Sequence, residues 1–111
     1  MHSPMSAQSN QFIGTLVTGN GTIIGSVRVD QIHDNGLLTG KMISVIPNNE
    51  INAIFTRLEE MVNTGVFSVL DDLEKKIALL NPFFRHSGEE EMAVEDLQIY
   101  PSTLAVSFRR K

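Results

Sequence analysis

The sequence contains no cysteine, and this absence excludes a whole set of chemistries. Disulfide bonds, thiolate nucleophiles, cysteine-based zinc sites and iron–sulfur clusters all require that residue. A basic stripe is also missing, since 9 Lys and Arg stand against 13 Asp and Glu, for a formal net charge of −4. This balance disfavours a general electrostatic attraction to nucleic acid or to anionic lipid.

No apolar run approaches the length of a membrane span, and the first residues lack the charged start and apolar core of a signal peptide. We therefore expect a cytoplasmic protein without a membrane partner. The 111 residues, 41% hydrophobic and 20% charged, suit one globular domain. Residues 1–10 are polar and show no hydrophobic period, so we expect a flexible N-terminal tail followed by a single domain over residues 11–111.

Two segments between Pro47 and Pro82 carry apolar residues at helical spacing, which predicts a pair of amphipathic helices. The first stripe comprises Ile51, Ile54, Phe55, Leu58, Met61 and Val62, and the second comprises Val66, Val69, Leu70, Leu73, Ile77 and Leu80. Asn48 or Asn49 can cap the first helix, and Gly65 can end it in the left-handed conformation. Each helix must bury its stripe against another apolar surface.

Alternation of apolar residues predicts strands on both sides of the helices. The predicted strands are residues 11–17, 22–30, 37–46, 92–100 and 103–110. Glycines in the first two connections favour tight hairpins, and Phe83 begins a further short extended segment. The order β-β-β-α-α-β-β predicts an α+β fold, with an antiparallel sheet of about five strands and the helix pair packed on one face.

The less apolar face of the first three strands still carries large aliphatic side chains, which a face turned to water seldom does. These residues are Ile13, Val17, Ile24, Leu38 and Met42. Three kinds of cover would explain them: a strongly curved sheet that closes on itself, a second copy of the chain, or a ligand. For so small a domain we expect a homodimer, with these residues at its interface.

No motif for nucleotide binding, acyl transfer or phosphoryl transfer is present. The histidines His2, His33 and His86 are far apart, so we predict no metal site, no cofactor and no catalytic residue. Glu95 and Asp96 interrupt a predicted strand where alternation would turn one acid toward the apolar side. A β-bulge or a late start of the strand explains this pattern, and a general base in a cleft is the functional alternative.

We therefore expect a non-enzymatic binding protein that contacts a protein or small-molecule partner through the sheet face or a basic rim. The rim would comprise Arg28, Lys41, Arg85, Arg109 and Arg110. The alternative is a small-ligand-binding protein or enzyme with a pocket between sheet and helices. The polar groups of that pocket would be His86, Glu95, Asp96 and Tyr100. Nucleic-acid binding rests only on the basic C-terminal cluster and is opposed by the net charge.

Overall fold

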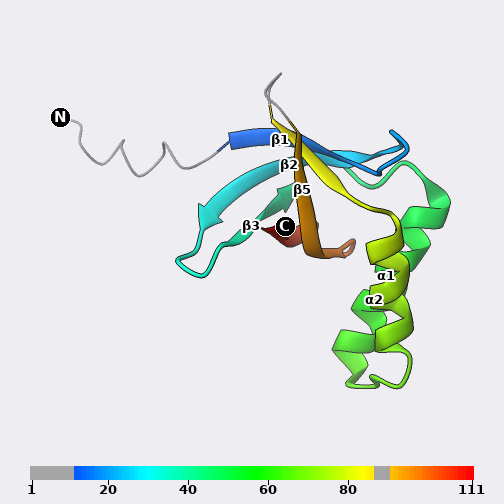
Figure 1. Ribbon diagram of the computed structural model, residues 1–111. Coiled ribbons are helices and arrows are strands. Elements are labelled where there is room, and N and C mark those ends of the chain that lie inside the picture. The colour runs from blue at the N-terminus through cyan, green and yellow to red at the C-terminus, as the bar shows by residue number, and fades with distance from the viewer. Residues whose placement is uncertain (1–11, 87–90) are drawn as a thin grey trace.

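The computed structural model describes residues 12–86 and 91–111, so the predicted tail over residues 1–10 lies outside the described residues. The elements are β1 (Phe12–Val17), β2 (Ile23–Ile32), β3 (Leu37–Met42), α1 (Asn49–Thr64), α2 (Leu70–Leu79), β4 (Phe83–His86), β5 (Glu91–Tyr100) and β6 (Ala105–Arg110). The two helices thus separate three strands from three others (Figure 1).

The six strands close into a barrel in the order β1-β2-β3-β6-β5-β4, and every neighbouring pair is antiparallel. The prediction of an α+β fold with antiparallel strands and two helices is confirmed, but the prediction of about five strands in an open sheet is wrong. The difference is β4, the short extended segment predicted to begin at Phe83, which pairs with β1 on one side and with β5 on the other. This strand has only four residues, too few to display alternation in the sequence.

Closure of the barrel covers most of the predicted second sheet face. Val17, Ile24, Leu38 and Met42 are all buried, with no more than 7% of their surface exposed. Ile13 differs, because 54% of its surface is exposed. Ile24, Leu38 and Met42 belong to the core that the closed sheet and the helices enclose. For these three residues the cover is the curved sheet that closes on itself, one of the three covers that the sequence pattern allowed.

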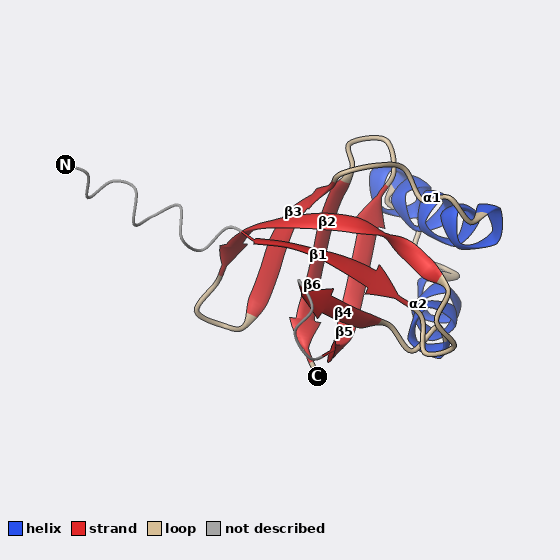
Figure 2. Ribbon diagram, turned by 90° about the horizontal axis from the view of Figure 1, so that it is seen from above, coloured by secondary structure: helices blue, strands red, loops and turns tan. Residues whose placement is uncertain are grey.

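Both helices lie at the same end of the barrel and pack against β5 (Figure 2). The N–H of Ile51 donates to Asn48 Oδ1 at 3.0 Å, which caps the start of α1. Gly65 ends this helix with φ of 73°, in the left-handed region where glycine is favoured. Phe55 of α1 and Ile77 of α2 are buried in the same core as the inward side chains of the barrel.

The second helix is shorter than its stripe suggests. It begins at Leu70, and the predicted stripe residue Val66 lies in the connection, where 55% of its surface is exposed.

Neither helix in residues 12–86 and 91–111 is long and apolar enough to cross a membrane.

A buried carboxylate fastens α1 to the barrel. Glu59 accepts a hydrogen bond from the N–H of Ser102 at 3.0 Å and another from the Ser102 hydroxyl. Ser102 lies in the turn between β5 and β6, 43 residues away in the sequence. The pair therefore links the first helix directly to the strand turn that it covers.

Candidate functional site

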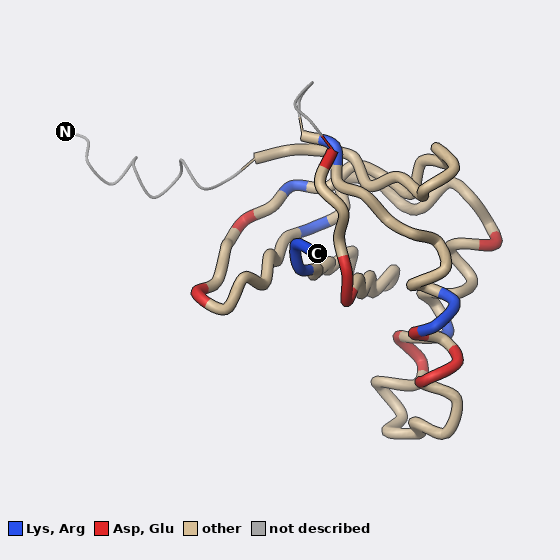
Figure 3. The backbone as a smooth tube through the Cα atoms, in the orientation of Figure 1, with Lys and Arg blue, Asp and Glu red and all other residues tan. Residues whose placement is uncertain are grey.

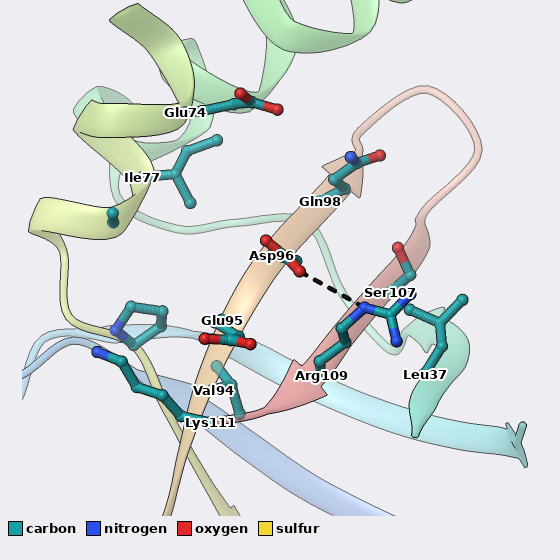
Figure 4. A pocket seen from close by; sticks show the side chains of 12 residues that line it. Leu37, Glu74, Ile77, Val94, Glu95, Asp96, Gln98, Ser107, Arg109 and Lys111 are labelled. Atoms are coloured by element: carbon teal, nitrogen blue, oxygen red, sulfur yellow. Dashed lines mark ion pairs between the residues drawn. The ribbon is translucent and has the colours of Figure 1, made fainter. Parts of the chain in front are cut away.

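A groove of about 720 Å³ runs between α2 and the outer surface of the barrel at β5 and β6. Its helix wall consists of Glu74, Ile77 and Ala78, followed by Pro82. The strand wall, together with residues at its edges, comprises Leu37, Val94, Glu95, Asp96, Gln98, Ser107, Arg109 and Lys111. Figure 4 shows Glu74 and Ile77 on the helix and the polar side chains of β5 and β6 below them. The groove therefore has a helix wall that is apolar except for Glu74, and a mainly polar strand wall.

The polar strand wall is produced by a β-bulge in β5. Glu95 pairs with Arg109 and Gln98 pairs with Ser107, so two residues of β5 stand opposite one residue of β6. A regular strand would turn Asp96 to the opposite side from Glu95. The bulge keeps both carboxylates on the outer surface, and it is the structural explanation that the interrupted sequence pattern had suggested.

The bulge also preserves the core. Asp96 has φ of 54°, a left-handed conformation that costs a residue other than glycine about 1 kcal/mol. In return, Leu97 turns into the barrel, where only 2% of its surface is exposed. Burial of a leucine side chain contributes about 2 kcal/mol, so the bulge is favourable on balance.

An arginine is held across the strand wall. Arg109 Nε lies 3.5 Å from Asp96 Oδ2, and Arg109 Nη1 donates to the carbonyl of Asn35 at 2.9 Å. This side chain therefore links the bulge to the turn between β2 and β3. Figure 4 marks this ion pair with a dashed line. The pair neutralises one acid and one base of the groove.

The remaining charges of the groove are unpaired in the part of the chain that the structure describes. Glu74, Glu95 and Lys111 have no ion-pair partner within 4 Å there. Counting Asp96 and Arg109 as well, three acids and two bases line the groove, for a net charge of −1. The groove thus presents two carboxylates, one on each wall, that are available to a ligand.

The four predicted ligand-binding residues do not share one pocket. Glu95 and Asp96 line the groove. Tyr100 is half-buried, and its hydroxyl donates to Gln98 Oε1 at 2.9 Å. His86 lies at the barrel end opposite the helices, with its ring centroid 4.8 Å from that of Phe12.

The predicted basic rim is spread over several strands, as the Lys and Arg positions in Figure 3 show. Arg28 and Lys41 are opposite each other on β2 and β3, whereas Arg85 lies on β4. Arg28 pairs with Asp30 at 2.9 Å, and Lys41 Nζ donates to a backbone carbonyl. Only Arg109 of the predicted rim lines the groove.

Glu74, Gln98 and Ser107 were not identified from the sequence as groove residues. For Glu74 a signal existed, because it precedes Ile77 by three residues and so shares its helix face. Gln98 and Ser107 come together only through the shifted pairing of β5 with β6, which the sequence does not display.

Within the described residues, no group of three His, Asp or Glu side chains is placed to hold a metal ion. Comparisons with protein-family models, with curated proteins and with solved structures find no match for this chain.

Proposed function

We propose that this chain is a non-enzymatic binding protein whose groove between α2 and the strands β5 and β6 binds a basic segment of a partner polypeptide. The observation that carries the proposal is the placement of Glu74 and Glu95 on opposite walls of one groove, each without an ion-pair partner among the described residues.

A lysine or arginine side chain suits both walls. Its aliphatic stem can contact Ile77, Ala78 and Pro82, while its charged head reaches the carboxylates of the groove. The lining residues carry a net charge of −1 and the whole chain carries −4, which favours a cationic ligand. Lys111 opposes this preference at one edge of the groove. An acidic segment should therefore bind more weakly than a basic one, but its binding should remain measurable.

The closed barrel also indicates how a peptide would be recognised. Peptides often bind by adding a strand to the exposed edge of a sheet. Each of the six described strands already has a neighbour on both sides, so the described barrel offers no edge for that mode. Recognition through side chains that enter a groove is the mode that remains.

The test is a titration of the protein with the capped peptide acetyl-Ala-Lys-Leu-Arg-Ala-amide, followed by two-dimensional amide NMR. We expect the largest shifts at Ile77, Glu95 and Gln98, which lie on both walls. Replacing both carboxylates, as Glu74→Gln with Glu95→Gln, should weaken binding about fivefold, because each exposed charge contributes about 0.5 kcal/mol.

The control is Glu60→Gln, which makes the same charge change as either single groove substitution, Glu74→Gln or Glu95→Gln, on an exposed residue of α1 outside the groove. This variant should bind the peptide almost as the unchanged protein does. The proposal fails if Glu60→Gln weakens binding as much as the groove variants, or if the counterpart acetyl-Ala-Glu-Leu-Glu-Ala-amide produces the same shifts with equal affinity.

A further inference from the structure

The end of the barrel opposite the helices holds a second cavity, of about 860 Å³, which we call the distal cavity. The strands β1, β3 and β5 begin at this end, and β2, β4 and β6 finish there. Its volume lies within the range of about 300–1,000 Å³ that is usual for small-molecule sites. The residues that matter for its chemistry are Phe12, Leu38, Phe84, His86, Met92 and Arg110.

Alternation along the strands shows that the distal cavity is the mouth of the barrel interior. His86 follows the buried Phe84 by two residues, and Arg110 follows the buried Phe108 by two. Side chains two apart on a strand point to the same side, so His86 and Arg110 occupy inward positions. Phe12 likewise occupies an inward position, at the start of β1. Two polar groups therefore stand where the same strands otherwise place core residues.

An aromatic wall leads from the core into the distal cavity. The rings of Phe12 and His86 meet edge to face with centroids 4.8 Å apart. The buried ring of Phe84 has its centroid 5.9 Å from that of Phe12 and 5.3 Å from that of Phe108. An aliphatic chain that entered the mouth would contact these rings together with Leu38 and Met92.

Among the described residues at the mouth, the charges are predominantly positive. The carboxylate of Glu91 is occupied by Arg85, whose Nε donates to it at 2.9 Å. Arg110 and Lys111 have no carboxylate within 4 Å among residues 12–86 and 91–111. Arg110, which is exposed, instead donates from Nε to the sulfur of Met92 at 3.1 Å, which is a weak acceptor. On a chain of net charge −4, the positive charge of the described mouth residues favours an anionic ligand here.

We propose that the distal cavity binds an amphiphilic carboxylate, with the aliphatic tail on the aromatic wall and the carboxylate at Arg110. The guanidinium of Arg110 can donate two hydrogen bonds to one carboxylate, a geometry that a neutral head group cannot use. The ring of His86 lies beside the same wall and can donate to the head group. This site is separate from the groove on the outer surface, although Lys111 borders both.

The test uses isothermal titration calorimetry with the full chain. The probes are octanoate and decanoate below their micelle concentrations. Decanoate should bind about tenfold more tightly, because two further methylene groups are buried. Amide NMR should show shifts at Phe12, Phe84 and Met92 and none at Ile77 or Glu95.

Variants then separate recognition of the head group from simple apolar binding. Arg110→Gln should weaken decanoate binding about tenfold and leave the binding of 1-decanol unchanged. Arg57→Gln makes the same charge change on an exposed residue of α1 outside the cavity, and it should alter neither affinity. An unchanged amide spectrum of each free variant confirms that the barrel is intact.

Three results would overturn the proposal. The first is equal or tighter binding of decyltrimethylammonium, which has the same tail with a cationic head. The second is the same affinity for octanoate and decanoate, since a tail in the mouth requires a dependence on its length. The third is a set of shifts confined to the exposed residues Ile43 and Val45, which would indicate nonspecific adsorption elsewhere.

Discussion

Replacing Glu59 with alanine tests how the helix pair is held on the barrel. The side chain is only 9% exposed and accepts hydrogen bonds from both the N–H and the hydroxyl of Ser102. A hydrogen bond to a charged group contributes about 1.5–3 kcal/mol. Because the turn that holds Ser102 is partly solvated, we take the lower end for each bond and expect Glu59→Ala to lower the free energy of unfolding by about 3 kcal/mol.

The two bonds can be separated by a double-mutant cycle. Ser102→Ala removes the hydroxyl but retains the backbone N–H, so it should cost about 1.5 kcal/mol. The double variant should cost little more than Glu59→Ala alone, which gives a coupling energy of about 1 kcal/mol between the two side chains. Urea unfolding at constant pH, followed by circular dichroism, measures each value.

The control is Glu60→Ala, in which an exposed neighbour of Glu59 on the same helix is changed in the same way. We expect an effect within about 0.5 kcal/mol, as is usual for surface positions. If Glu59→Ala and Glu60→Ala destabilise the protein equally, the carboxylate does not fasten α1 to the barrel. The reasoning is also refuted if the cycle shows no coupling between Glu59 and Ser102.

Three further substitutions test the fold at single positions. Gly40→Ala should lower stability by about 3 kcal/mol in thermal unfolding, because the added Cβ would lie 2.0 Å from the carbonyl oxygen of Arg28; Thr39→Ala should cost far less, and equal losses would contradict the argument. Asp96→Val should cost about 2 kcal/mol in urea unfolding and Asp96→Asn less than about 0.5 kcal/mol, since asparagine tolerates the left-handed conformation of the bulge and β-branched valine does not; similar values would refute that reason. Asn48→Ala should cost about 1 kcal/mol of the free energy of unfolding through loss of the helix cap, whereas Asn49→Ala should cost almost nothing. The reverse order would show that Asn49 caps the helix.

The parts of the fold that sequence reasoning predicted are those encoded locally. The stripe of α1, its cap at Asn48 or Asn49 and its end at Gly65 all follow from residues within one helix. The structure has the cap at Asn48 and the end at Gly65, and it buries most of the stripe, although 37% of the surface of Val62 is exposed. Closure of the barrel was not predictable in the same way. It depends on pairing between Gly14–Val17 and the four residues of β4, and so short a segment carries no period that would indicate a partner.

The candidate site shows the same division. Glu95 and Asp96 break a local alternation of apolar residues, which indicated a β-bulge as one explanation. The structure has this bulge. Glu74 belongs to the groove only because α2 packs beside β5. Residue type alone predicted that His86 and Tyr100 would line a pocket with the two acids. The barrel instead places His86 at its far mouth.

Closure through β4 also has a kinetic consequence. In the finished barrel β1 is paired to β4, and β3 is paired to β6, so both outer edges of the first three strands are covered by the second half of the chain. During synthesis these strands emerge before their partners, and until β4 and β6 have followed they expose two unpaired edges. Pairings of such long sequence separation also slow folding. The first 46 residues, produced alone, should therefore associate with one another through the two edges that the complete chain covers.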